Sequence, residues 1–161
     1  MMGELLENIV NMTRSYSLSR TLFDTINSIY LPKVARQGFT AARIRFNKCD
    51  NPIMLEKYLI GYYIDITLQF YNEEDAYYSI DVNYHKSTWT DEEIALIIEY
   101  FLKEYDYEGF DITDSLESNE VAISWRDAYE QRYSETDNTE VEEYSDNPAK
   151  NEIRKQLQSI L

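Results

Sequence analysis

Two neighbouring segments of the chain alternate apolar and polar residues with a period of two, the pattern of a β-strand that buries one face. Within residues 61–71 every second residue from 64 to 70 is apolar, and within residues 76–86 the same holds from 78 to 84. The polar sequence Asn-Glu-Glu-Asp between them has the length of a hairpin turn. This pattern predicts an antiparallel hairpin covered on one side only.

Further strands are predicted on both sides of this hairpin. Residues 39–46 place small and apolar side chains on one face of a strand, with Arg43 and Arg45 on the other. Residues 110–112 and 121–125 predict a second hairpin, with the polar residues between them as its loop. We therefore expect an antiparallel sheet of about four to five strands.

The N-terminal part of the chain has the period of α-helices. Apolar residues fall close to helical spacing in residues 4–13, and the spacing is clearer in residues 22–30. We expect Ser17 or Ser19 to cap the start of the second helix, and Pro32 to end or bend it. The N-terminal region therefore predicts two helices before the first strand.

A stronger helix signal follows the first hairpin. Thr90 with Glu93 three residues later forms a capping-box pattern, and the acids of the first turn suit the helix dipole. Apolar residues at helical spacing over residues 91–105 predict that this helix packs on the open face of the sheet. A further helix is expected over residues 126–135.

These elements predict the α+β class, with N-terminal helices, an antiparallel sheet and one helix packed on it. We expect residues 1–133 to form a single domain. Residues 134–148 are acidic and nearly without apolar side chains, which predicts a mobile segment. Residues 149–161 have apolar residues at helical spacing and predict a short C-terminal amphipathic helix that docks on the body or on a partner.

The net charge of −15 is concentrated in one part of the chain. Residues 1–90 hold nine Lys and Arg against ten Asp and Glu, whereas residues 91–148 hold three against nineteen, a net charge of −16. Residues 149–161 return a charge of +2. Because an acidic surface repels nucleic acid and attracts proteins that bind nucleic acid, this asymmetry predicts a class of partner.

The acids of residues 91–146 are expected to make one negative surface. Outward carboxylates two residues apart on a strand are about 6.6 Å apart, so such a surface can occupy a groove that binds the phosphates of DNA. The alternative is that these acids solvate an exposed face, as runs of charge usually do. The candidate partner-binding residues are Glu92, Glu93, Glu99, Glu104, Asp106, Glu108, Asp111, Asp114, Glu117, Glu120, Asp127, Glu130, Glu135, Asp137, Glu140, Glu142 and Glu143.

Fifteen tyrosines add a second type of contact residue. Tyr62, Tyr63, Tyr71 and Tyr77 fall on or near the polar face of the first hairpin, where they predict either cross-strand pairs or an interface patch. Other tyrosines are interleaved with the acids of the C-terminal half, a mixture suited to an Arg-rich partner through cation–π contacts and salt links.

The acidic stretches DEEIALIIEYFLKEYDYEGFD and SETDNTEVEEYSD, on a small α+β domain, resemble phage and mobile-element proteins that inhibit CRISPR nucleases or restriction enzymes by mimicking DNA. The resemblance is one of class and carries no diagnostic motif. It implies a non-enzymatic inhibitor, without cofactor or turnover, that binds a basic nucleic-acid-binding protein and blocks its DNA groove. It also implies host-defence evasion in the cytoplasm of a bacterial cell. The near-neutral first half allows an inhibitor that docks elsewhere on a nuclease.

Three other functions remain open from the sequence. An immunity protein against a nuclease toxin would also be small and acidic. A metal-dependent, carboxylate-based enzyme is possible because residues 106–117 are rich in acids, although the EF-hand pattern is absent. A structural or assembly protein of a phage would be marked by self-association.

The sequence offers little for catalysis. His85 is the only histidine and Cys49, beside Lys48, is the only cysteine, and their spacing predicts no Ser-His-Asp or Cys-His arrangement. The N-terminal segment has neither a basic region nor a sustained apolar run, so no signal peptide is expected. No stretch approaches the roughly 18 apolar residues of a membrane span. We expect no direct contact with nucleic acid and no membrane association.

Overall fold

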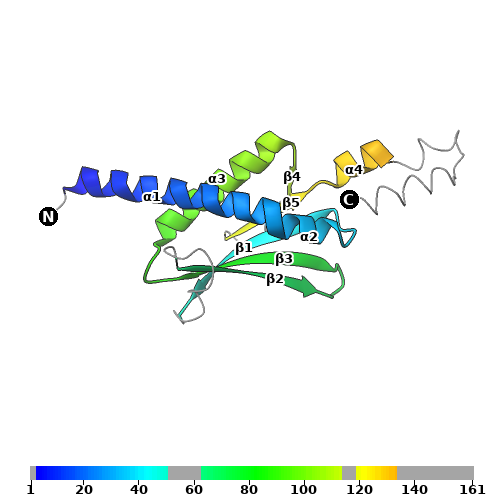
Figure 1. Cartoon of the computed structure of the whole chain (residues 1–161), viewed down its shortest axis with the longest axis horizontal. Helices are drawn as coiled ribbons and strands as arrows, with labels where there is room; N and C mark the ends of the chain where they lie inside the picture. The colour runs from blue at the N-terminus through cyan, green and yellow to red at the C-terminus, as the bar shows by residue number, and fades with distance from the viewer. Residues whose placement is uncertain (1–2, 51–62, 114–118, 134–161) are drawn as a thin grey trace, which may run out of the picture.

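The computed structural model of the chain describes residues 3–50, 63–113 and 119–133. Three helical segments precede the first strand, and two helices accompany the later strands (Figure 1). The elements are α1 (Glu4–Thr25), a π-helix (Ile26–Tyr30), α2 (Leu31–Ala35), β1 (Ala41–Cys49), β2 (Ile64–Tyr71), β3 (Tyr77–His85), α3 (Asp91–Glu108), β4 (Asp111–Thr113), β5 (Glu120–Ser124) and α4 (Arg126–Tyr133). The predicted α+β class is confirmed.

The five strands form one sheet in the order β2-β3-β1-β5-β4. Both predicted hairpins are present, because β2 pairs with β3 and β4 pairs with β5 in antiparallel fashion. The expectation of an all-antiparallel sheet is wrong in one pairing: β1 runs parallel to β3, with Ile44 opposite Ile80. The connection from Cys49 to Ile64 is long enough to carry β2 past one strand position, so that β3 inserts beside β1.

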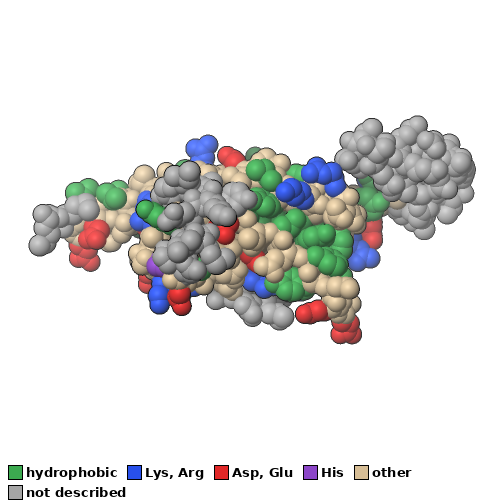
Figure 2. Space-filling model, turned by 60° about the horizontal axis from the view of Figure 1, so that its bottom comes forward, with side chains coloured by type: hydrophobic (Ala, Val, Ile, Leu, Met, Phe, Trp, Pro, Cys, Tyr) green, Lys and Arg blue, Asp and Glu red, His purple; other side chains and the backbone are tan. Residues whose placement is uncertain are grey.

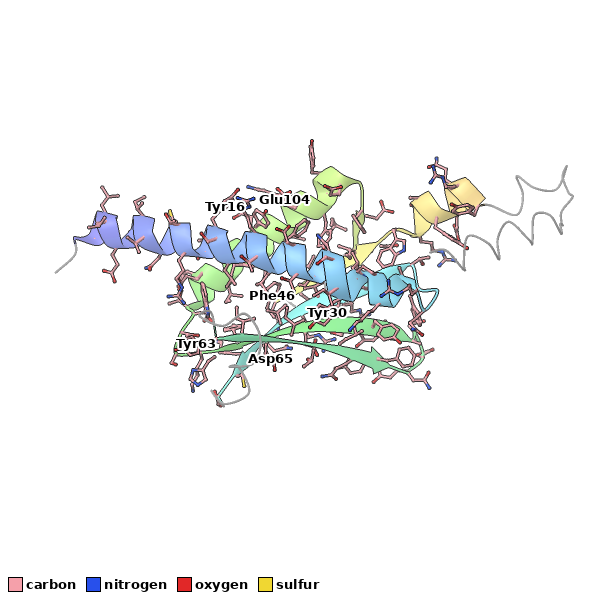
Figure 3. All side chains as sticks on the ribbon, in the orientation of Figure 1. Tyr16, Tyr30, Phe46, Tyr63, Asp65 and Glu104 are labelled. Atoms are coloured by element: carbon pink, nitrogen blue, oxygen red, sulfur yellow. The ribbon has the colours of Figure 1, made fainter. Side chains whose placement is uncertain are left out.

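The helices cover one face of this sheet (Figure 1). Side chains from β1 and β3, among them Ile44, Phe46 and Ile80, are fully buried or nearly so beneath them. Phe46 lies between the sheet and the helices (Figure 3), where its ring meets the edge of Phe101 of α3 at 5.5 Å. The core is therefore a single apolar layer between the helices and the sheet.

The N-terminal helix is continuous where two helices were expected. Ser19 does not cap a new helix, because its hydroxyl donates to the carbonyl of Ser15 in the preceding turn, at 2.8 Å. Thr13, Thr21 and Thr25 bond back to the preceding turn in the same way. Serine and threonine can use the helix backbone as their acceptor, and this choice removes the helix break that the sequence suggested.

Pro32 does not end the helix either. It is the second residue of α2 and comes directly after the π-helix. Because proline has no N–H to donate, the regular α-helical bonding is interrupted here, yet the chain stays helical on both sides. The π-helix just before it has wider turns than an α-helix. In a regular α-helix, residues four apart do not stay on exactly the same side, because one turn takes 3.6 residues. The wider turn of the π-helix keeps such residues on the side that faces the core. The buried residues at this spacing are Leu18, Leu22, Ile26, Tyr30 and Val34.

The π-helix is fixed to α3 by a hydrogen bond. The Tyr105 hydroxyl donates to Asn27 Oδ1 at 2.6 Å, and the Tyr105 side chain is completely buried. Burial raises the pKa of Tyr105 above the ordinary tyrosine value near 10. The folded state therefore favours the neutral phenol.

The predicted capping box of α3 is confirmed. The Thr90 hydroxyl accepts from the Glu93 amide at 3.1 Å, while the Glu93 carboxylate accepts from the Thr90 amide at 2.9 Å. Arg14 of α1 lies 3.6 Å from the centre of the Trp89 ring and 3.9 Å from Glu93 Oε2. The start of α3 is thus anchored on α1.

Three sequence interpretations fall outside the described residues. They concern residues 52–60, whose sequence fits either a short helix or a lead-in to the next strand, the expected mobile segment 134–148 and the expected C-terminal helix 149–161. Of the helix predicted over 126–135, the described part is present as α4, and residues 134 and 135 lie outside the described residues. The helix expected over 91–105 extends to Glu108.

Replacing Tyr105 by phenylalanine tests its role in pH-dependent stability. We expect Tyr105→Phe to lower the free energy of unfolding at pH 7 by about 1 kcal/mol, because Asn27 loses its buried donor. Above pH 10 the unfolded state releases the tyrosine proton and the native state keeps it, so the stability of the natural protein falls as pH rises. Urea unfolding from pH 7 to pH 11 should show a shallower alkaline decline for the variant. Parallel curves would contradict this role of Tyr105.

Candidate functional site

The acids of α3 lie on two different sides of the helix. Glu92, Glu99 and Asp106 follow one another at intervals of seven on one exposed side. Glu104, which is half-buried, and Glu108, which is exposed, lie one turn apart on another side. The apolar residues of α3 face the sheet, so the helical period directs most of the acids to the outside.

The end of α3 and the start of β4 carry three exposed acids within six residues. Asp106, Glu108 and the first residue of β4, Asp111, are all exposed, and none of them has an ion pair with a described residue. Gly109 turns the chain between helix and strand with φ of +101°, a conformation that favours glycine. Tyr107 stands between two of these acids with 85% of its surface exposed. We call Asp106, Tyr107, Glu108 and Asp111 the acidic corner.

The acidic corner lies at the end of α3 where the helix dipole disfavours negative charge. The last turn of α3 contains no basic residue, although the carboxyl end of a helix is partly negative and favours cations. The first turn holds Asp91, Glu92 and Glu93, where the dipole favours acids. The acids at the end of α3 therefore cost stability, while those at its start contribute to it.

Two of the candidate residues are used inside the fold. Glu93 is 6% exposed and belongs to the capping box. Glu120 is 7% exposed, and its Oε2 lies 3.6 Å from Nε of Arg43 on the neighbouring strand. Both carboxylates have partners from distant parts of the chain, which places them outside the exposed acidic surface.

Other candidates are exposed but paired. Glu99 lies 3.5 Å from Lys103, one turn away on α3, and Glu130 lies 2.9 Å from Arg126, one turn away on α4. Asp127 is exposed in the first turn of α4. Outside the described residues lie Asp114, Glu117, Glu135, Asp137, Glu140, Glu142 and Glu143.

The face of the sheet opposite the helices carries a cluster that the sequence only hinted at. Tyr71 and Tyr77, predicted as a possible cross-strand pair, stack with ring centres 5.0 Å apart. Arg43 lies 3.9 Å from the centre of the Tyr77 ring, and Arg45 donates to the Tyr77 hydroxyl at 3.3 Å. Figure 2 shows basic and acidic side chains interspersed on this side of the molecule.

This cluster is internally balanced. Asp81 is 4% exposed and accepts from the Ser79 hydroxyl at 2.6 Å. Burial alone lowers the pKa of Arg45, but the bond to Tyr77 and the charge of Asp81 outweigh it and raise that pKa. Arg45 is therefore held charged beside Asp81, and Arg43 lies 3.6 Å from Glu120, so both arginines are directed at groups of the same fold.

The residues considered for catalysis do not form a recognisable catalytic centre. His85 is half-buried, and its ring nitrogens lie 2.5 Å from the Ser87 hydroxyl oxygen and 3.1 Å from the Asp50 carbonyl oxygen. Cys49 is opposite His85 in the parallel pairing of β1 and β3, a proximity that the sequence separation concealed. In the described part of the chain, no group of three or more His, Cys, Asp or Glu is arranged to hold a metal ion.

Comparison of the chain with protein-family models, with curated proteins and with solved structures returned no match. Within residues 3–50, 63–113 and 119–133, no helix has the length and apolar character needed to cross a membrane.

Neutralising the acids at the two ends of α3 should have opposite effects. The double substitution Asp106→Asn and Glu108→Gln should raise the melting temperature by about 2–3 °C, because it removes negative charge from the negative end of the helix dipole. Glu92→Gln is the matched control at the start of the helix and should lower it slightly. Differential scanning calorimetry at low salt measures both. A lower melting temperature for the double variant would mean that these acids stabilise the fold.

Proposed function

We propose that this protein is a non-enzymatic inhibitor that binds a basic, nucleic-acid-processing protein through its acidic corner. The most specific form of the proposal is an inhibitor of a CRISPR nuclease or restriction enzyme that occupies the groove for DNA. The observation that carries it is the position of Asp106 and Glu108, exposed and without ion pairs to described residues, at the helix end that disfavours acids. Binding to a partner would explain why these carboxylates stand at a position where they lower the stability of the fold.

The chemistry of the acidic corner suits a cationic groove. DNA-binding grooves carry Lys and Arg spaced to meet phosphates, and three carboxylates within six residues offer several contacts to such side chains. Tyr107 adds an exposed aromatic ring between the acids. Arginine can stack on this ring while it pairs with a neighbouring carboxylate, and tyrosine is enriched among the residues that dominate protein interfaces.

The opposite face of the sheet supports a protein partner over direct binding of nucleic acid. Arg43 and Arg45 are its central basic residues, and both are engaged with tyrosine and carboxylate groups of the same face. A nucleic-acid platform needs basic side chains that are available for phosphates. The exposed acids at the end of α3, which have no ion pairs with described residues, are therefore a better candidate for a binding site than the arginines of the sheet.

Capture of partners from a bacterial lysate tests this proposal. The natural protein as bait should retain a nucleic-acid enzyme, and excess duplex DNA should release that enzyme because both ligands compete for one groove. The triple variant Asp106→Lys, Glu108→Lys and Asp111→Lys should retain at least tenfold less of it. The captured enzyme, once identified by mass spectrometry, should lose DNA binding when the natural protein is added.

A matched charge reversal in the turn between β2 and β3 is the control. Glu73, Glu74 and Asp75 are also exposed, so replacing all three by lysine changes the net charge by the same amount. This variant should still retain most of the enzyme. A small loss is expected, because the lower net negative charge weakens the long-range attraction to a basic partner. Equal retention by both triple variants, or equal loss from both, would refute a specific role for the acidic corner.

A further inference from the structure

The N-terminal half of α1 extends beyond the rest of the fold. In Figure 1 this end of the helix projects past the sheet and α3. Every residue from 3 to 14 is exposed, whereas Ser15, Leu18, Ser19 and Leu22 are buried. Arg14, held over Trp89, is the contact at which the projecting part meets the body. About three turns of helix therefore stand without tertiary packing from the described residues.

The projecting part continues a helix that is packed on the body, and it lacks tertiary packing of its own from the described residues. Helices in proteins are stabilised mainly by packing an apolar face. The projecting part has such a face, formed by apolar side chains three and four residues apart. The exposed fractions along it are Leu5 75%, Ile9 50%, Met12 55% and Tyr16 55%, with Leu6 (54%) and Val10 (45%) on its flank.

The same face of α1 leads into a groove between α1 and α3. The groove has a volume of about 290 Å³, and its apolar wall includes Met12, Tyr16 and Leu96. Two small residues of α1, Ser15 and Ser19, also line it. Ser15 is 2% exposed, and its hydroxyl has no hydrogen-bond partner in the described residues. The groove thus offers apolar surface together with one unsatisfied polar group.

We propose that the projecting part of α1 binds in the α1–α3 groove of a second copy of this chain, and that the exchange is reciprocal. An antiparallel pair of α1 helices with Met12 near the two-fold axis places residue i of one copy opposite residue 24 − i of the other. Ile9 then faces Ser15 of the second copy, and Leu5 faces Ser19. The large side chains of one helix meet the small residues of the other, as a two-fold contact between identical surfaces requires.

Polar groups and charge favour a second copy as the occupant. Asn8 is exposed on the same flank of α1 as Ser15, so the antiparallel pair brings its amide next to the unsatisfied hydroxyl. The groove is lined by both Lys103 and Glu99, which lie 3.5 Å apart, so their charges balance and leave no net negative charge in the groove against Glu4 and Glu7 of the projecting part. The acidic end of α3 lies away from the projecting part of α1 (Figure 1), so its exposed carboxylates do not face that part in the same copy.

Analytical ultracentrifugation of the full chain tests the pairing. The natural protein should sediment as a species of twice 19.2 kDa at micromolar concentration. Ile9→Glu should raise the dissociation constant at least tenfold, because it places a charge in the apolar contact. Leu96→Glu, on the groove side of α3, should also weaken the dimer. Asn11→Glu is the matched control on the same projecting turns, since it adds the same charge on the side of the helix away from the stripe, and it should remain dimeric.

A cross-link identifies the geometry independently. In a Cys49→Ser background, Met12→Cys should form an interchain disulfide under mild oxidation, whereas Asn11→Cys should not. Both substituted positions are exposed, so circular dichroism should show an unchanged fold. A natural protein that is monomeric at 100 µM, a dimer that Ile9→Glu leaves intact, or assembly beyond two chains would each overturn the proposal. The acidic corner takes no part in the contact, so its triple variant should remain dimeric.

Discussion

The arrangement of this protein depends on the two unlike edges of β1. One edge pairs in parallel with β3 and the other pairs antiparallel with β5, so this strand joins the first hairpin to the second within the described sheet. Its buried side chains also hold the helices, because Phe46 packs against Phe101 of α3. Its other face presents Arg43 and Arg45 to the tyrosine pair of the hairpin. A single strand thus joins the core to the charged side of the sheet.

The charge of the chain serves two separate purposes in this framework. Glu93 and Glu120 are buried and face arginines from α1 and β1, so they belong to the contacts that hold the elements together. The carboxylates at the end of α3 have no such partners among the described residues, and they stand where the helix itself disfavours them. A net charge counted over the sequence combines both groups, although only the second is available to another molecule.

The sequence was sufficient wherever one local pattern decided the outcome. The alternation of β2 and β3, the capping box at Thr90 and the helical period of α3 each specify their element within a few residues. It was insufficient where a distant partner decided. Nothing near β1 indicates that β3 will run parallel to it, and nothing near Glu120 indicates that Arg43 will approach it. The serines of α1 were misread because a hydroxyl can cap a helix or bond back within one.

The π-helix at Ile26–Tyr30 determines which side of α1 faces the sheet and which side faces solvent. Its wider turn holds the buried side of α1 over the sheet, and the Tyr105 hydroxyl fixes that turn through Asn27. Loss of one residue from this segment would restore a regular helix and rotate the whole N-terminal half of α1 by about 100° about its axis. Insertions and deletions are commonly tolerated in loops, but in this helix a single one would redirect a distant surface without changing any residue of it.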